Sequence, residues 1–416
     1  MPDEVALADS LVATASPASS RSRLPFVVHV LASGTFLMLT SEFIVAGILP
    51  EIASDLQVSL TQAGYLITVF AVGMIVGAPL MTMLTRRLSK RLTLVLALVV
   101  FVAGHVVVAL GTEFALLMAA RFVTALATGA FWAVSAVVAT RAAGPSLGSR
   151  AVGVVGAGGS LATVLGVPLG AFLAHHVGWR GTFWALAVAA VVAVVLVARL
   201  VPGDASFEQS SSLGSELVGL RSPRLWLVLG ACATTCGGVL ATYSFIAPIL
   251  IERSGVSVSL VPLVLTGFGV GSLVGTLVCG RLGDTHPHAV TVITPAVTAV
   301  ILLGIALFSD STWVTVVLVV MLGLFGLSAN TVLIHLAVRL AGQAATLGSA
   351  LSVASFNLGT ATGTAVAGAV LVTSLGLTGP AVVGAVIVAL TLLPTIALAV
   401  VARRRREDTL AVPAAP

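Results

Sequence analysis

Two charged residues, Glu42 and Arg121, lie inside stretches of sequence that are otherwise apolar enough to cross a bilayer. Glu42 interrupts the run TSEFIVAGILPEI (residues 40–52), and Arg121 opens the run RFVTALATGAFWA (residues 121–133). At a helical rise of about 1.5 Å per residue, both lie about 12 Å below the same membrane surface, so the two side chains can meet. A water-poor site favours the neutral carboxyl of Glu42, while a nearby guanidinium favours the carboxylate. A change in water access or in the distance to Arg121 would therefore load or release a proton.

A purely structural ion pair between Glu42 and Arg121 is the alternative interpretation. Polar and amphipathic residues follow Arg121 at helical spacing: Thr124, Thr128, Trp132 and Ser135. Such a stripe is typical of a helix that faces a cavity or protein partners rather than lipid. We favour a proton-carrying role for Glu42, with Arg121 as its electrostatic partner.

The composition indicates a polytopic membrane protein. Of 416 residues, 58% are hydrophobic and 8% are charged, and the mean hydropathy is +1.15. A soluble protein of this length needs far more charge on its surface. The three cysteines, Cys232, Cys236 and Cys279, fall in apolar runs and predict neither a disulfide framework nor a metal site.

Hydropathy and turn signals predict an all-α membrane protein with twelve transmembrane helices. The predicted ranges are 25–49, 61–84, 92–111, 114–140, 149–173, 181–201, 224–250, 258–282, 289–309, 312–339, 346–374 and 380–402. A Ser- and Gly-rich cytoplasmic linker at 202–223 divides them into two six-helix bundles, 25–201 and 224–402. The flanking segments are predicted to be a disordered cytoplasmic tail (1–24) and a basic cytoplasmic tail (403–416).

The distribution of basic residues predicts the orientation of the chain. With both termini in the cytoplasm, only Arg180 and Arg253 fall on the opposite side of the membrane among the basic residues outside the spans. That asymmetry satisfies the positive-inside rule and predicts a multi-pass membrane protein in this orientation. Nineteen arginines against one lysine indicate a GC-rich bacterial genome, so the expected location is the bacterial inner (cell) membrane. The pI of 9.8 thus reflects topology and gives no reason to expect nucleic-acid binding.

The two halves match one another at a constant offset of 198 residues. Identical residues at this offset include Pro50 and Pro248, Thr68 and Thr266, Phe70 and Phe268, Gly73 and Gly271, and Gly77 and Gly275. Two parallel repeats are typical of transporters whose substrate site lies between the halves near the midplane. Neither intramembrane charge is duplicated, since Leu240 and Val319 occupy the equivalent positions. We therefore expect the first half to couple protons and the second to shape the substrate cavity.

Five segments carry a resemblance to a known family: TSEFIVAGILPEIASDL (40–56), RFVTALATGAFWA (121–133), GVPLG (166–170), GWRGTF (178–183) and ASFNLGTATG (354–363). Together they resemble the major facilitator superfamily, specifically its twelve-helix drug:proton antiporters. The first segment resembles the branch of bacterial chloramphenicol exporters and arabinose-type sugar-efflux proteins. The resemblance implies that Arg121 is the functional arginine of the helix-4 motif. It also implies that Gly166, Pro168 and Gly170 form the helix-5 antiporter motif, which bends or seals that helix.

The loop after the second helix departs from the family pattern. In TMLTRRLSKR (82–91), Arg86 stands where the family carries an aspartate, so the usual acidic member of the cytoplasmic gate is missing. Arg87 and Arg91 remain as basic gating candidates. The second-half copy, GRLGD (280–284), retains its acid, which makes Asp284 either a gating carboxylate or a solvated loop residue.

Polar and aromatic residues deep in other spans are candidates for the wall of a substrate cavity. They are Tyr65, Phe131, Trp132, Tyr243, Phe245, Asn330, His335, Phe356 and Asn357. Packing is the alternative for each of them. Asn330 and Asn357 are the strongest candidates because a buried amide needs hydrogen-bond partners.

The sequence offers little support for an enzyme, because it contains no HExxH, Gly-x-Ser-x-Gly or P-loop motif. We expect a proton-coupled efflux transporter that exports a small, largely apolar drug of the chloramphenicol type by alternating access. Export of a sugar or nucleoside metabolite by the same machinery is the alternative, and an uncoupled facilitator is a third. The expected partners are the small molecule, protons and the lipid bilayer, without a cofactor or metal, and the expected state is a monomer.

Overall fold

The computed structural model describes residues 24–84, 88–144, 147–203, 222–341 and 345–411, and the regular elements of these residues are all helices. The all-α fold class predicted from the sequence is confirmed. Eleven described helical segments are long and apolar enough to cross a membrane by length and composition. The 26-residue helix α17 is long enough but is not among them, because Ser, Thr, Gly and Asn residues lower its hydropathy.

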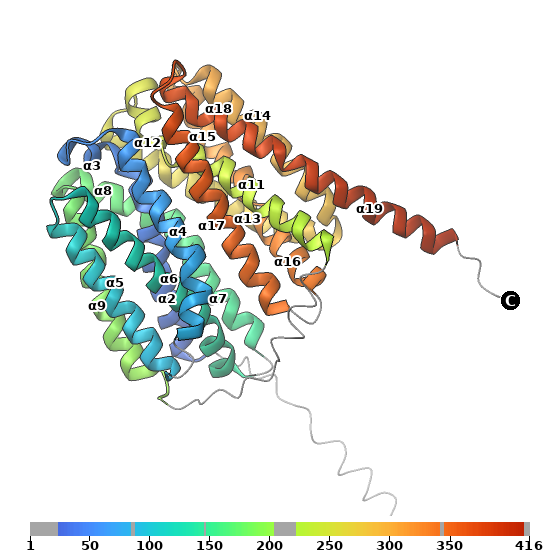
Figure 1. The fold of residues 1–416 in the computed structure, drawn as a ribbon, viewed down its shortest axis with the longest axis horizontal. Helices are drawn as coiled ribbons and strands as arrows, with labels where there is room; N and C mark the ends of the chain where they lie inside the picture. Colours follow the sequence, from blue (N-terminus) through green and yellow to red (C-terminus); the bar gives the residue numbers. More distant parts are fainter. Residues whose placement is uncertain (1–23, 85–87, 145–146, 204–221, 342–344, 412–416) are drawn as a thin grey trace, which may run out of the picture.

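The first half of the chain forms one bundle (Figure 1). Its helices are α2 (Phe26–Gly47), α3 (Leu49–Asp55), α4 (Leu60–Leu84), α5 (Lys90–Leu110), α6 (Phe114–Ala143), α7 (Gly148–Leu161), α8 (Val167–Val177) and α9 (Trp179–Leu200). A π-helical turn at Ala162–Gly166 joins α7 to α8.

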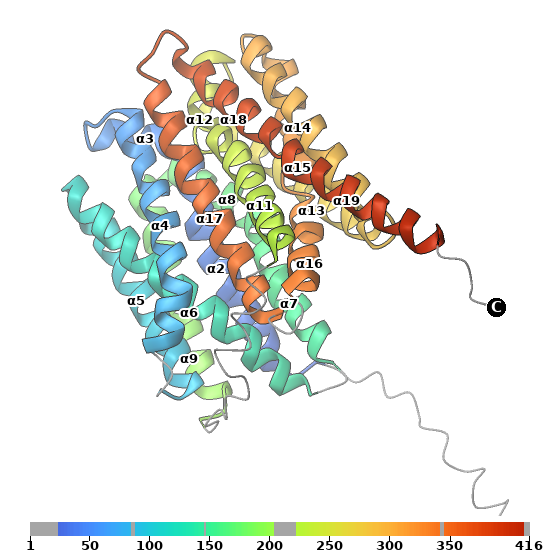
Figure 2. The same cartoon turned by 45° about the vertical axis from the view of Figure 1, so that its right-hand side comes forward.

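The second half forms the other bundle. Its helices are α11 (Pro223–Tyr243), α12 (Ile246–Pro248), α13 (Val261–Thr285), α14 (Pro287–Phe308), α15 (Thr312–Gly326), α16 (Asn330–Ala341), α17 (Ala345–Val370), α18 (Gly379–Leu390) and α19 (Leu392–Ala411). Short helical turns lie at Ile249–Arg253, Val258–Leu260 and Gly376–Thr378. Helix α17 lies between α4 of the first half and α11 of the second (Figure 2).

Several predicted helices are interrupted, and proline explains three of the breaks. Helix α2 ends at Gly47 before Pro50, α11 ends at Tyr243 before Pro248, and the π-helical turn ends at Gly166 before Pro168. Proline lacks a donor N–H and crowds the preceding turn, so a helix bends or restarts there. At Pro168, where the sequence predicts a bend, the structure has a change from a π-helical turn to α-helix.

The last helix continues to Ala411, beyond the predicted end at residue 402. The segment RRRREDTLA that extends it contains helix-forming Arg, Glu, Leu and Ala and has no Gly or Pro to stop it. The predicted tail at 1–24, apart from its last residue, and most of the predicted linker lie outside the described residues.

The apolar cores show how the two halves meet. One core spans both halves at the end that carries α3 and α12, and it includes Ile48 from the first half and Phe245 and Leu250 from the second. We call this end, defined by Leu49–Asp55 and Ile246–Pro248, the sealed end. At the opposite end each half has a core of its own, one around Phe101 and the other around Leu333. The halves are thus packed together at the sealed end and are stabilised separately at the other.

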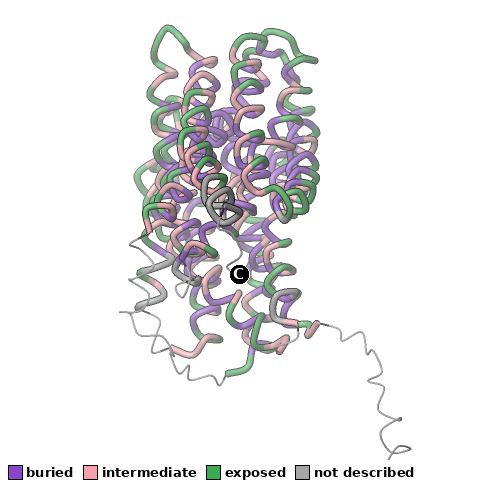
Figure 3. Tube along the Cα trace, turned by 90° about the vertical axis from the view of Figure 1, so that its right-hand side faces the viewer, coloured by how far each residue is buried: buried purple, intermediate pink, exposed green. Residues whose placement is uncertain are grey.

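Exposed residues lie along the outward faces of the helices (Figure 3), and many of them are large and apolar. Val188, Leu263 and Val300 are examples, each more than half exposed. In a bilayer such side chains face hydrocarbon, because helices there bury polar and small residues against one another.

Equivalent glycines bring equivalent helices together in the two halves. The close approaches are Gly73 to Phe122, Gly77 to Leu126, Gly271 to Val320 and Gly275 to Leu324. Both residues of each second-half pair lie 198 positions after those of the matching first-half pair, the offset found in the sequence. The contacts between α4 and α6 and between α13 and α15 are therefore two copies of one packing arrangement.

Replacing Gly275 with valine is expected to destabilise the second half. A Cβ at Gly275 would lie 2.8 Å from the carbonyl carbon of Leu324, so α13 and α15 would have to separate. Overpacking of this kind costs about 1–3 kcal/mol, and a thermal melt in detergent should show a lower midpoint. The control is Gly230→Val on α11, where no atom lies within 4 Å of an added Cβ. Equal midpoints for the two variants would contradict the packing argument.

Candidate functional site

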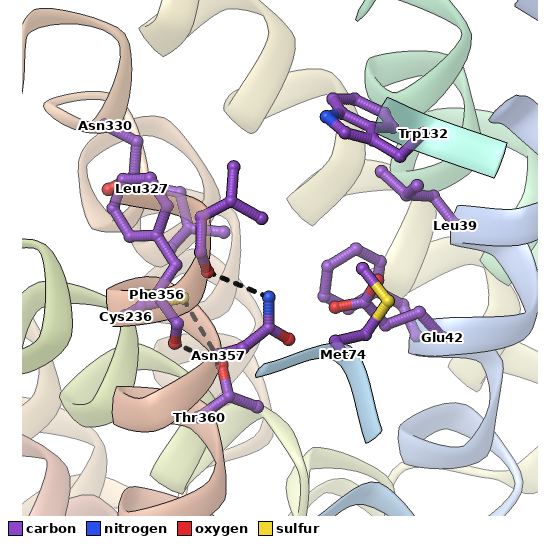
Figure 4. Close-up of a pocket in the computed structure, with 12 residues that line it drawn as sticks. Leu39, Glu42, Met74, Trp132, Cys236, Leu327, Asn330, Phe356, Asn357 and Thr360 are labelled. Atoms are coloured by element: carbon purple, nitrogen blue, oxygen red, sulfur yellow. Dashed lines mark hydrogen bonds between the residues drawn. The ribbon is translucent and has the colours of Figure 1, made fainter. Parts of the chain in front are cut away.

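A cavity of about 160 Å³ lies between the two halves (Figure 4). The first half contributes Leu39, Glu42, Phe43, Met74 and Trp132. The second half contributes Cys236, Leu327, Asn330, Val353, Phe356, Asn357 and Thr360. One wall thus carries a carboxyl group among apolar and aromatic side chains, and the facing wall carries two amides and a hydroxyl.

Five of the residues predicted from the sequence come together in this cavity: Glu42, Trp132, Asn330, Phe356 and Asn357. Asn357 points from α17 toward Met74 and Glu42 of the first half (Figure 4). Its amide N–H donates to the carbonyl oxygen of Val353 at 3.0 Å, while its Oδ1 is buried without a partner. An acceptor of this kind is available to a donor group of a bound molecule.

Four other predicted residues do not line the cavity. Phe131 is buried against Gly34, and Phe245 is buried against Gly64. Tyr243 is buried with its ring stacked on Phe268 at 4.3 Å. Tyr65 is 38% exposed and lies outside the cavity. The first three fill the protein core, so packing rather than binding accounts for them.

His335 lines a second, separate cavity of about 230 Å³ together with Gly280, Gly283, Thr331 and Val332. Among the gating candidates, Arg91 is exposed at the start of α5. Arg87 lies outside the described residues, and so does the side chain of Asp284.

The predicted helix-5 motif packs directly on the helix that carries Glu42. A side chain at Gly166 would collide with Thr40, and one at Gly170 would collide with Ile44. Thr40 and Ile44 lie on either side of Glu42 along α2. The glycines of the motif therefore allow the close approach that fixes this part of α2.

Arg121 is fully enclosed by the first half, with 2% of its surface exposed. Its Nη1 donates to the carbonyl oxygen of Ser41 at 2.9 Å and to the Ser41 hydroxyl at 3.0 Å. Its Nε donates to the carbonyl oxygen of Leu66 at 3.5 Å. The guanidinium lies over the ring of Phe70, 4.1 Å from the centroid, and Nη2 has no partner. Backbone dipoles and a π face therefore stabilise this charge.

No hydrogen bond or ion pair joins Glu42 to Arg121, although each charge acts on the other through space. Two ion pairs between described residues lie toward the sealed end, Arg180 with Asp55 and Arg253 with Asp310. The direct contact that a structural Glu42–Arg121 pair requires is absent from this state. Glu42 instead faces the cavity (Figure 4).

His105 extends the polar site behind Arg121. Its Nε2 lies 2.8 Å from the Ser41 hydroxyl, and its Nδ1 lies 2.7 Å from the carbonyl oxygen of Phe101. The ring stacks on Phe101 at 3.9 Å and contacts Phe183 at 5.7 Å between centroids. Neither His105 nor Ser41 is among the site residues predicted from the sequence. The sequence feature that could have identified this part of the site is Ser41, a hydroxyl residue directly next to Glu42.

Glu51 is a second partly enclosed carboxyl, outside the membrane-spanning helices at the sealed end. Burial raises the pKa of Glu51, while its own backbone N–H and the nearby His175 act in the opposite direction. Its Oε2 is buried without a partner. Because the raised pKa favours the protonated acid, the contribution of Glu51 to stability is present at low pH and is lost as the pH rises through that pKa.

Two facing helical halves with a cavity between them are the architecture of a secondary transporter. A family model described as Major Facilitator Superfamily matches residues 31–260 and again residues 231–415. The chain belongs to the major facilitator superfamily, whose members are transporters rather than enzymes.

Three curated relatives match most of the chain. A chloramphenicol resistance protein of Streptomyces lividans is 35% identical over 89% of this chain and 95% of its own length. The inner membrane transport protein YdhP of Escherichia coli (strain K12) is 30% identical over 94% of this chain and 99% of its own. The putative transporter AraJ of Escherichia coli (strain K12) is 31% identical over 81% and 86%.

Two solved structures share the fold. A bacterial homologue of the human lysosomal transporter Spinster, in an inward-facing and unoccupied conformation, has a TM-score of 0.67 at 15% identity over 89% of this chain and 94% of that one. The transporter FucP, in the outward conformation, has a TM-score of 0.61 at 17% identity over 88% and 97%.

Proposed function

We propose that this chain is a proton-coupled efflux transporter of the bacterial cell membrane that exports a small, largely apolar drug of the chloramphenicol type. The observation that carries the proposal is the position of Glu42, a carboxyl group without an ion-pair partner that faces the cavity between the halves. The 35% identity to a chloramphenicol resistance protein supports the substrate class.

The geometry supports an exchange of drug for proton. A bare carboxylate is costly in a water-poor cavity, so closing the cavity around it requires either a proton on Glu42 or a bound molecule that replaces the lost water. The charge of Arg121 lowers the free-energy cost of the Glu42 carboxylate without bonding to it, because the guanidinium donates to Ser41 and Leu66 instead. The protein can therefore change between its two access states when Glu42 is protonated or when drug is bound. It cannot readily do so when the cavity is empty and Glu42 is charged.

The direction of exchange follows from the orientation that the basic residues predict. The sealed end then faces outward, and the cavity is reached from the cytoplasm. Drug enters from the cytoplasm after Glu42 releases its proton there. The halves then rock, drug leaves outward, and Glu42 takes up a proton from outside. The cavity of about 160 Å³ is smaller than the range of about 300–1,000 Å³ typical of drug sites, so binding must widen it.

A second candidate is export of a hydroxyl-rich metabolite such as a sugar or nucleoside. The observation that favours it is the polar wall of the second half, where Asn330, Asn357 and Thr360 lie together. The opposite wall favours the drug, because Phe43 and Trp132 provide aromatic surface for an apolar body.

The deciding experiment is chloramphenicol uptake into energised inverted membrane vesicles that contain the protein. Antiport predicts accumulation that a protonophore stops. If chloramphenicol is ignored but an acidic lumen drives uptake of a radiolabelled pentose or nucleoside, the second candidate replaces the first. Uptake that is unaffected by the protonophore would indicate an uncoupled facilitator and contradict both.

Replacing Asn357 with leucine is expected to weaken drug binding without abolishing turnover. The change preserves the approximate volume but removes the unpartnered Oδ1 from the cavity wall. Loss of one hydrogen bond of about 1.4 kcal/mol should raise the KM for drug about tenfold. Thr362→Val is the matched control, since Thr362 is on the same helix but is exposed and bonded to its own backbone. An unchanged KM in Asn357→Leu would remove this residue from the substrate site.

A further inference from the structure

We propose that His105 and Ser41 position Arg121 for proton coupling, an inference that rests on the transport function proposed above. Neither residue lines the cavity, so neither is offered as a drug contact. Both are buried within the first half, with 2% of the His105 surface and none of the Ser41 surface exposed. They act through the guanidinium of Arg121.

The hydrogen-bond directions in this site follow from the chemistry of Arg121. A guanidinium can only donate, so the Ser41 hydroxyl oxygen accepts from Nη1. The Ser41 O–H is then free to donate to Nε2 of His105, 2.8 Å away. Nδ1–H of His105 donates to the carbonyl oxygen of Phe101 at 2.7 Å. The chain of donors therefore requires a neutral imidazole with its proton on Nδ1.

This chain of bonds fixes where the positive charge lies relative to Glu42. Ser41 is the residue next to Glu42 on α2, and it holds Arg121 through both its carbonyl oxygen and its hydroxyl. One guanidinium nitrogen, Nη2, is left without a partner. An Arg121 released from the Ser41 hydroxyl can turn this free nitrogen toward the carboxylate of Glu42 and form the ion pair that the present state lacks. In such a pair, the carboxylate of Glu42 would remain bonded to Arg121 and could not take up a proton again.

The test compares His105→Phe with Ser41→Ala and with the double variant. Phenylalanine preserves the ring packing between Phe101 and Phe183 but cannot accept from Ser41. We expect each single variant to bind chloramphenicol as the wild type does, while proton-driven accumulation falls about tenfold, the effect of one lost hydrogen bond in a buried charged site. The double variant should be no worse than Ser41→Ala alone, because Ser41→Ala already removes the bond that His105→Phe breaks.

Two further variants separate positioning from general damage to the protein. His105→Gln offers an oxygen that can accept from Ser41 and should recover part of the accumulation. His176→Phe is the matched control: His176 also bonds to the carbonyl oxygen four residues earlier and contacts a phenylalanine ring at 4.3 Å, but it is exposed on α8. It should transport as the wild type does.

Several outcomes would overturn the inference. Normal accumulation in His105→Phe would show that Arg121 needs no such support, and multiplied losses in the double variant would show that the two residues act independently. Loss of drug binding in parallel with accumulation in both single variants would show a structural role only. Absence of proton-driven accumulation in the wild type would instead overturn the proposed function, and this inference with it.

Discussion

Vesicles that contain Glu42→Gln are expected to accumulate no more drug than vesicles that lack the protein. Glutamine has nearly the shape of glutamate but cannot take up or release a proton, so the proton gradient can no longer drive transport through this residue. Glu42 faces the cavity and has no ion-pair partner. Its replacement therefore removes the carrier without breaking a structural contact. The measurement is drug uptake into inverted vesicles driven by an imposed pH gradient.

Drug-for-drug exchange provides the internal check on this variant. Exchange needs alternating access but no net proton movement, so Glu42→Gln should retain it. Glu113→Gln is the matched control, because Glu113 is an exposed carboxylate before α6 that makes no side-chain capping bond. Full proton-driven accumulation by Glu42→Gln would leave this residue without a role in coupling.

Replacement of Arg121 by lysine is expected to lower transport by about 10- to 100-fold even though the positive charge remains. The guanidinium donates to the carbonyl oxygens of Ser41 and Leu66 through different nitrogens, and it lies over the ring of Phe70. A lysine ammonium is a single point of charge that cannot reproduce both. Losing one charged hydrogen bond of about 1.5–3 kcal/mol accounts for the expected factor. Initial uptake rates at saturating drug measure it.

Arg180→Lys is the corresponding control. Arg180 also lies over an aromatic ring, that of Trp179 at 4.3 Å, but it is half-buried at the sealed end, away from the cavity. A surface ion pair such as the one with Asp55 contributes little, so transport should persist. Equal activity in the two lysine variants would mean that charge alone, without bond direction, is what the site requires from Arg121.

The sequence predicts the helices well because their apolar runs are long and bounded by turn residues. Hydropathy and turn signals predicted a span at 346–374, and α17 (Ala345–Val370) occupies this range despite its polar composition. The breaks were predicted less well. Only Pro168 was expected to bend a helix, whereas Pro50 and Pro248 also end one. Proline restricts the backbone locally, but whether a helix bends or restarts depends on the packing around it.

The candidate site could be predicted only in part. Glu42, Asn330 and Asn357 stand out in the sequence because a polar group in an apolar span is costly unless it has a partner or a function. Phe131 and Trp132 are adjacent and equally aromatic, yet neighbours on a helix point about 100° apart, so only Trp132 reaches the cavity. The anchors of Arg121 were invisible for a different reason. They include the backbone carbonyls of Ser41 and Leu66, which any residue type would supply.

The duplicated glycine contacts make the second half an internal reference for the first. At the offset that superposes Gly73 and Phe122 on Gly271 and Val320, Glu42 corresponds to Leu240, and Arg121 corresponds to Val319. The two halves thus share one packing arrangement, but only the first carries the intramembrane charges, Glu42 on α2 and Arg121 on α6. Only the first half therefore has the free-energy cost of burying these charges within the bilayer. A comparison of the two halves therefore separates the free-energy cost of the two intramembrane charges from that of the shared scaffold, within a single polypeptide.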